Sequence, residues 1–341
     1  MARGMLTFNG TIDLTQFWPQ SVKAGNTSDS DADTVKVKAV PHSAHFTSPT
    51  GKAQMTDFLD KAGFFHNVKS KGGAKTLKFK PVMNAKGEVD MRLQGIDAPE
   101  LHYMTQIFGN PLFRQLMGET STVQFFNFLK SHAKGNNIQC KIFTQVNKPN
   151  DVFDKFGRCV GDILIQDKNQ KFLNVNQWLV ENGWAFPAYY NSMTNAEINA
   201  IDVLAVKAMK KKLNIWQFLS QKMTELDKKL IHNKKDGTYS VAKDRKPPVI
   251  FSKLFHRHWT FQIKNQKKFS TAGYQKFVLA QKIDTCCLTS DFLKRGFPKK
   301  PPLLGSFLAP NGVIKFKPAD IVFHEAPSTV KDAKRKFLTT F

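Results

Sequence analysis

The sequence predicts a β-rich α+β fold, and the order of its elements predicts which one. Apolar and polar residues alternate in short runs bounded by turn residues, which is typical of half-buried strands. One longer segment with helical spacing, residues 113–133, lies between the third and the fourth of these runs. Five short strands with a helix before the fourth are the layout of a five-stranded OB-fold barrel.

Each strand is expected from the local pattern of apolar and polar residues. The first lies within residues 5–19, where Pro19 ends it, and the second within residues 31–40, where valines alternate with lysines. A strand at 77–83, LKFKPVM, leads through a hairpin turn, NAKG, into the strand VDMRL at 89–93. The fourth and fifth strands are NIQCKIFTQV at 137–146 and RCVGDILI at 158–165.

Two further helices complete this domain, which is expected to end near residue 219. The first runs from Asn174 to Gly183, with Asn as its cap and Gly as its stop. Thr194 and Glu197 form a capping box for the second, which runs to Lys212. Residues 41–74 are expected to be an insertion with one helical piece at 55–62, and it could be a lid, a substrate contact or a surface excursion.

The rest of the chain is basic and differs in pattern. Residues 220–248 predict a polar linker or a loose helical hairpin, and residues 249–341 predict a smaller, mainly β domain with strands at HWTFQI, QKFVLAQKI and GVIKFKPADIVF. Lysines at 264–300 alternate with Phe269, Tyr274 and Phe277, which fits either nucleic-acid binding or core aromatics between solvated lysines. His256 and His258 would share one face of a strand, as a metal site requires, but a plain basic strand is expected.

Charge indicates the partner. The formal net charge is +24, and residues 213–341 hold 25 Lys+Arg against 9 Asp+Glu. Such an excess favours a polyanion, with nucleic acid as the expected partner and an anionic membrane surface as its rival. No apolar run approaches the roughly 20 residues of a membrane span or forms a signal peptide. We therefore expect no membrane partner and a cytoplasmic address, with leaderless secretion left open.

The cysteines favour a reducing compartment. The chain has 4 Cys, without a CxxC spacing, and two of them are adjacent at Cys286 and Cys287. This argues against a disulfide framework or a structural zinc site. We expect reduced thiols in the core.

Three separated segments place charged residues at expected strand ends. They are DADT at 31–34, RLQGIDAPE at 92–100 and DKFGR at 154–158. Carboxylates and guanidinium groups in such short segments suit chemistry on a phosphate, because a cation can stabilise the oxygens of phosphorus and a carboxylate can take a proton.

These three segments resemble the staphylococcal nuclease (thermonuclease) family. That family carries, in this order, an Asp-Gly-Asp-Thr turn, an Arg-Leu-x-x-[Val/Ile]-Asp-[Thr/Ala]-Pro-Glu strand and an Asp-x-[Tyr/Phe]-Gly-Arg turn. NQWLVENGWA at 176–185 and KKLNIW at 211–216 extend the resemblance, which covers about residues 5–219. The resemblance implies the same OB-fold barrel.

The resemblance also implies roles for individual residues. Arg92 and Arg158 would stabilise the charge that develops on the phosphate, and Glu100 would be the general base for the attacking water. Ca²⁺ would be bound by the carboxylates of Asp33 and Asp97 and by the main-chain carbonyl of Ala98.

The same resemblance implies substrate contacts at Lys155, Phe156 and Tyr189. Phe156 lacks the hydroxyl of the family's Tyr, which puts contacts to a terminal phosphate in doubt but not cleavage. Ala32 replaces the family's Gly, so the first turn cannot need a strongly positive φ there.

The leading functional hypothesis is a Ca²⁺-dependent, sugar-non-specific nuclease that hydrolyses DNA and RNA to leave 3′-phosphate ends, with the basic C-terminal part aiding substrate retention or targeting. The alternative is a non-catalytic OB-fold module that binds nucleic acid or protein. A third hypothesis, an antibacterial or defence effector, is compatible with the first and would require either an inhibitor or immunity protein as partner or strict separation from the cell's own genome. No pattern in the sequence sets an oligomeric state.

Overall fold

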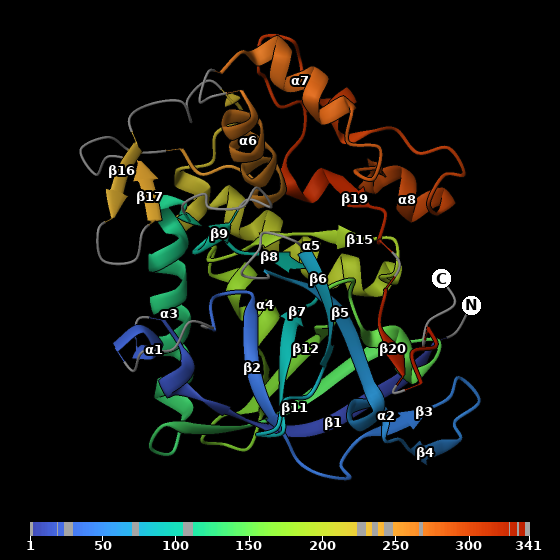
Figure 1. Cartoon of the computed structure of the whole chain (residues 1–341). Helices are drawn as coiled ribbons and strands as arrows, with labels where there is room; N and C mark the ends of the chain where they lie inside the picture. The colour runs from blue at the N-terminus through green and yellow to red at the C-terminus, as the bar shows by residue number, and fades with distance from the viewer. Residues whose placement is uncertain are drawn as a thin grey trace. The chain divides into compact units, whose positions relative to one another are not determined.

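The computed structural model describes residues 3–18, 20–23, 30–69, 75–104, 112–223, 230–233, 238–241, 248–265, 269–326, 328–332 and 334–337. The chain packs as two compact units (Figure 1), one made of Met1–Gln94, Phe126–Asn176 and Ala326–Phe341 and the other of Gly95–Phe125 and Gln177–Glu325. The expected domain boundaries at 219 and 249 do not coincide with this division and stay a prediction. Among the described helices, none has the length and apolar composition needed to cross a bilayer.

The first unit contains the predicted five-stranded barrel. Its strands are β1 (Gly4–Asp13), β2 (Thr34–Ala39), β7 (Glu88–Leu93), β11 (Asn137–Val146) and β12 (Cys159–Gln166). Each pairs with the next in the order β1–β2–β7–β12–β11, and β11 pairs back along the whole of β1, so the sheet closes. Only β7 and β12 run parallel among these pairs. The OB-fold expectation is confirmed.

The interior of the barrel is filled by every second side chain of its strands. In β7, Val89, Met91 and Leu93 are buried, and the residues between them lie on the other face. β1 and β11 alternate in the same way, which explains why this part of the fold was readable from the sequence. The remaining elements around the barrel are η1 (Leu14–Gln16), α1 (Gln20–Lys23), η2 (Pro149–Val152) and β13 (Phe172–Asn174).

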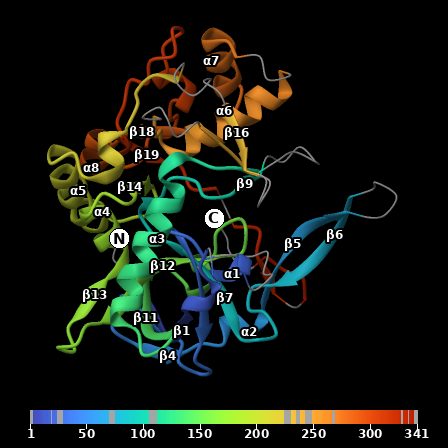
Figure 2. The same cartoon turned by 90° about the vertical axis from the view of Figure 1, so that its left-hand side faces the viewer.

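The insertion, residues 41–74, forms one hairpin and the first strand of a second. β3 (His45–Thr47) and β4 (Ala53–Met55) pair with each other, and β3 also pairs with β1. The helical piece is α2 (Phe58–Lys61), and it leads into the hairpin of β5 (Ala62–Lys69) and β6 (Lys75–Pro81). β5 and β6 lie side by side in Figure 2, and β20 (Lys331–Asp332) from the end of the chain pairs with β5. The NAKG turn forms as predicted, with Gly87 at φ +76°.

The expected helices are present. α3 (Leu116–His132) lies between β7 and β11 in the chain and contributes residues to both units. α4 (Val175–Glu181) and α5 (Asn195–Lys210) follow, and Thr194 and Glu197 form the predicted capping box at the start of α5. The other elements of the second unit up to residue 250 are β8 (Ile96–Asp97), β9 (Tyr103–Met104), β10 (Leu112–Phe113), β14 (Phe186–Pro187), β15 (Tyr189–Tyr190), η3 (Asn214–Gln217), β16 (Leu230–Asn233) and β17 (Thr238–Val241).

Beyond residue 250, two segments expected to be strands are helices. HWTFQI lies in α6 (Ser252–Lys264), and much of QKFVLAQKI lies in α7 (Thr271–Leu279), next to α6 (Figure 2). In α6 the buried positions are 252, 254, 255, 258, 259, 261 and 262, a helical pattern that extends beyond the six residues of HWTFQI. Only the end of the third segment is a strand, β19 (Ile321–Phe323), which pairs with β18 (Cys286–Leu288) and β15. The other elements are α8 (Thr289–Arg295), η5 (Leu304–Phe307) and η6 (Pro318–Asp320).

The aromatic rings in this region pack against other rings, with Tyr274 buried and Phe269 and Phe277 half-buried. Tyr274 is fully buried, and its hydroxyl donates to the Leu254 carbonyl at 3.1 Å. Phe269 and Phe277 both pack against Phe261. All four cysteines are free and buried, as expected.

Candidate functional site

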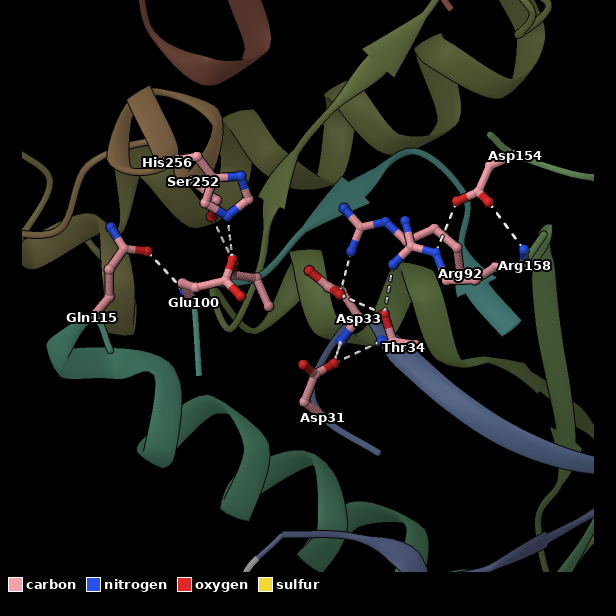
Figure 3. A network of polar contacts seen from close by, with 11 residues as sticks. Asp31, Asp33, Thr34, Arg92, Glu100, Gln115, Asp154, Arg158, Ser252 and His256 are labelled. Atoms are coloured by element: carbon pink, nitrogen blue, oxygen red, sulfur yellow. Dashed lines mark hydrogen bonds and ion pairs between the residues drawn. The ribbon is translucent and has the colours of Figure 1, made fainter. Parts of the chain in front are cut away.

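The DADT segment forms a tight turn at the start of β2. The Asp31 carboxylate accepts the backbone N–H groups of Asp33 and Thr34, at 3.1 and 2.8 Å, and thereby fixes the turn. Ala32 is buried and is not among the residues with positive φ, as its side chain requires. The turn presents the carboxylate of Asp33 and the hydroxyl of Thr34 (Figure 3).

Arg92 lies opposite this turn, on the outer face of β7. Its register partners are Thr34 on β2 and Val160 on β12. The Arg92 Nη1 forms an ion pair with the Asp33 Oδ1, and the two side chains are only 16% and 14% exposed. An exposed ion pair commonly contributes less than about 1 kcal/mol to the free energy of unfolding. This pair is largely shielded from water, so its attraction is screened less.

Arg158 comes from the DKFGR turn that precedes β12. The Asp154 Oδ1 accepts the backbone N–H groups of Phe156 and Arg158, at 2.8 and 3.0 Å, while its Oδ2 accepts the Arg158 Nε at 2.8 Å. One carboxylate therefore shapes the turn and orients the guanidinium that the turn carries.

The Thr34 hydroxyl connects the two arginines. It accepts the Arg158 Nη1 at 3.3 Å and donates to the Asp33 Oδ1, which also receives Arg92, at 3.1 Å. Figure 3 shows both guanidinium groups directed at this turn. We call Asp33, Thr34, Arg92, Asp154 and Arg158 the arginine cluster. All five residues belong to the first unit.

Lys155 and Phe156 lie at the tip of the DKFGR turn. The Phe156 ring is 52% exposed. The Lys155 ammonium and the Arg158 guanidinium lie 4.8 and 5.3 Å from its centroid. An exposed ring flanked by cations is suited to contact with nucleic acid, so the predicted substrate role stays open for both residues.

The insertion contacts this turn. Gly157 has φ +79°, and a Cβ there would lie 2.2 Å from the ring of Phe64 on β5. The end of the chain reaches the same turn, because the hydroxyls of Ser328 and Thr329 donate to the carbonyls of Asp154 and Lys155 at 3.3 and 3.4 Å.

In the second unit, the IDAPE segment is fixed through its backbone. β8 pairs with β14 so that Asp97 faces Phe186. The Ala98 carbonyl accepts the Ser252 hydroxyl at 2.7 Å. The Glu100 N–H donates to the Gln115 Oε1, and the Glu100 carbonyl accepts the Gln115 N–H, both at 2.8 Å. Gln115 is buried and thereby fixes the backbone of the candidate base from both sides.

The carboxylate of Glu100 has a partner that the sequence did not reveal. The Glu100 Oε2 lies 2.5 Å from the Nε2 of His256 on α6 (Figure 3). The sequence predicts that His256 and His258 belong to a strand and share one of its faces. That interpretation is wrong, because these residues lie on a helix and do not share a face.

The residues next to His256 have structural roles. The Arg257 guanidinium bonds both oxygens of Asp284, at 2.5 and 2.8 Å. His258 is buried among aromatic rings, and burial lowers the pKa of its imidazole to about 3. A metal site on this pair of histidines is therefore contradicted.

Tyr189 is not placed to touch a substrate. It is fully buried in the second unit, and its hydroxyl donates to the Asp202 Oδ1 at 3.1 Å. Burial also raises the pKa of this hydroxyl. The expected substrate contact is corrected to a core position.

The donor chemistry implied for a metal is that of Ca²⁺. The Asp33 and Asp97 carboxylates are hard oxygen ligands, which fit this ion. In the described ranges, however, no three His, Cys, Asp or Glu side chains lie close enough together to hold a metal. Because the Ala98 carbonyl accepts Ser252, an ion would have to share or displace that hydrogen bond.

Comparison with known families identifies part of the chain. Residues 90–218 match the family model described as staphylococcal nuclease homologue. The match confirms the resemblance over that segment, which contains Arg92, Asp97, Glu100 and Arg158, and the turn at residues 31–34 lies outside it. A comparison with curated proteins gives no match.

Proposed function

We propose that the protein hydrolyses phosphodiester bonds of nucleic acids, and the match of residues 90–218 to the family model described as staphylococcal nuclease homologue supports this proposal. The observation that carries this proposal is the arginine cluster. Two guanidinium groups, one from β7 and one from the turn that precedes β12, are directed at the turn at residues 31–34 and are oriented by the carboxylates of Asp33 and Asp154.

Such a cluster meets the main requirement of the reaction. When water attacks a phosphodiester, negative charge accumulates on the oxygens of phosphorus, and preorganised positive charge lowers the barrier. Guanidinium groups stay charged at any working pH and offer parallel donors to two oxygens. Since Arg92 and Arg158 are already hydrogen-bonded in position, little reorganisation would be needed when a phosphate binds.

Glu100 is the proposed general base. A carboxylate that takes a proton from water must keep a defined direction, and Gln115 fixes the backbone that carries it. The resulting reaction would leave 3′-phosphate ends on DNA and RNA alike.

Ca²⁺ is the proposed cofactor, and it would supply Lewis acidity and hold the phosphate. Asp33 and Asp97 would bind it through carboxylate oxygens. Asp33 already binds Arg92, so this arginine would be shared between the carboxylate and the substrate.

The net charge of +24 supports retention of the substrate. Attraction of this kind is independent of sequence and weakens as salt is added. Lys155 and the exposed Phe156 ring would add a local contact to the phosphate and to a base.

A second candidate function is a binding module without catalysis. It is favoured by the hydrogen bonds of the IDAPE segment. The Ser252 hydroxyl donates to the Ala98 carbonyl, and His256 is hydrogen-bonded to the Glu100 carboxylate, so both groups already have partners within the chain. A segment satisfied by its own chain can serve as scaffold while the basic surface binds nucleic acid.

One experiment separates the two functions. The purified chain is incubated with plasmid, single-stranded DNA and RNA, with Ca²⁺, Mg²⁺ or chelator, beside Arg158→Ala. Arg295→Ala removes the same charge at an exposed site on α8 and is the matched control. We expect Ca²⁺-dependent loss of all three substrates, reduced at least ~10²-fold in Arg158→Ala and unchanged in Arg295→Ala.

The other outcomes are equally informative. Mobility shifts without cleavage in any divalent cation would favour the binding module. If the protein neither cleaves nor shifts any of the three substrates, both functions are contradicted.

A further inference from the structure

We propose that helix α6 positions the general base, with His256 as the positioning residue that orients the Glu100 carboxylate. This inference rests on the proposed nuclease function and assigns a role to a helix that lies outside the segment matched by the family model. It applies to the second unit alone, to which every residue concerned belongs.

One face of α6 holds the IDAPE segment at two points. The Ser252 hydroxyl donates to the Ala98 carbonyl at 2.7 Å, and the His256 Nε2 lies 2.5 Å from the Glu100 Oε2. Ser252 and His256 are four residues apart, a spacing that places both side chains on one face of a helix. The two contacts therefore act as a pair on residues 98 and 100.

The imidazole is itself held in place. The Tyr103 ring stacks on it, with centroids 4.0 Å apart and planes within 10°. The Tyr103 hydroxyl lies 2.9 Å from the Thr260 Oγ1, which donates to the His256 carbonyl at 2.8 Å. Because Tyr103 follows Glu100 by three residues, the histidine is clamped between the base and a ring from the same segment.

This geometry suits a general base. An ionised carboxylate only accepts hydrogen bonds, so the His256 Nε2 must carry the proton in this contact. With Oε2 engaged in this way, the direction of the other oxygen is defined, and that oxygen can receive a proton from water. A base oriented by a third group is a recurrent arrangement in activated sites.

The contact could instead restrain the enzyme by withholding Glu100 from water. The two roles predict opposite results. Loss of the histidine would slow a reaction that needs an oriented base, and it would speed a reaction that the contact blocks.

The test measures cleavage by full-length protein with His256→Ala, His256→Gln, Glu100→Ala and the double variant Glu100→Ala/His256→Ala. His45→Ala, which removes an exposed imidazole from β3, is the control. We expect kcat to fall ~10–100-fold in His256→Ala with KM little changed, as the loss of one hydrogen bond to a charged group predicts. Glutamine retains an N–H donor, so His256→Gln should recover much of the rate.

The double variant separates positioning from a general effect on folding. If His256 acts through Glu100, its removal should cost no further activity once Glu100 is gone. Melting curves for each variant check that the fold is retained.

Three results would overturn the proposal. They are unchanged cleavage in His256→Ala, faster cleavage in that variant, and a further loss in the double variant equal to the loss in the single one. If the wild-type protein cleaves no substrate, the proposed function fails and this inference fails with it. If the wild type cleaves and His256→Ala equals it, the inference fails alone.

Discussion

Asp154 offers a sharp test of the arginine cluster, because the chain contains a near copy of its turn. The Asp154 Oδ1 accepts N–H groups from the second and the fourth residue after it. The Asp167 Oδ1 accepts the N–H groups of Asn169 and Lys171, both at 2.8 Å, in the turn after β12. In both turns the backbone also closes through a 2.9 Å hydrogen bond from the Asp N–H.

The two turns differ in what the second carboxylate oxygen does. The Asp154 Oδ2 orients the Arg158 guanidinium, and these side chains are 13% and 27% exposed. Asp154→Ala and Asp167→Ala each remove two hydrogen bonds from backbone to carboxylate, so both should cost about 1–3 kcal/mol of unfolding free energy. Only Asp154→Ala releases an arginine.

The expected difference is in activity. A charge-assisted hydrogen bond is worth about 1.5–3 kcal/mol, and its loss from an oriented transition-state group corresponds to a fall of ~10–100-fold in kcat. Cleavage rates and chemical unfolding are measured for both variants. Equal cleavage by the two variants would refute the role given to Arg158, as would wild-type activity in Asp154→Ala.

Three further predictions concern single residues. Burial lowers the pKa of His258 to about 3, so as pH falls below about 6.5 the unfolded state binds a proton that the folded state does not. The free energy of unfolding should therefore fall between about pH 6.5 and pH 3, by up to about 1.4 kcal/mol per pH unit. Urea melts at several pH values should show a smaller slope for His258→Leu. Gly157→Ala should lower stability by about 1–3 kcal/mol in thermal melts, because φ is positive and Phe64 fills the space; an unchanged melting temperature would contradict this. Thr34→Val keeps the shape and removes the hydroxyl between the arginines, so kcat should fall about 10-fold while the fold by circular dichroism is kept.

The barrel could be predicted from the sequence because apolar and polar residues alternate along most of its strands. β11 alternates along all of Asn137–Val146, and no tertiary contact had to override that pattern. The segments at 31–34, 92–100 and 154–158 were readable for a different reason, since their spacing is unusual enough to identify by resemblance.

The second unit was less readable. Short apolar runs such as HWTFQI suit a strand and a helix equally, and α6 was recognisable only from a longer window. The Glu100–His256 contact spans 156 residues of sequence, and no local pattern indicates such a pair. Tyr189 was misassigned because a motif position does not tell whether a ring faces solvent or the core.

Residues 328–332 are made late in synthesis, and they contribute contacts to the first unit. The hydroxyl that bonds the Asp154 carbonyl lies 174 residues further along, and β20 joins β5 from further away still, since Lys331 pairs with Gly63. A chain that leaves the ribosome N-terminus first therefore exposes the DKFGR turn without the Ser328 contact while the next 174 residues are made. In a nuclease, this would leave the turn that carries Arg158 without these contacts until residues 328–332 are made.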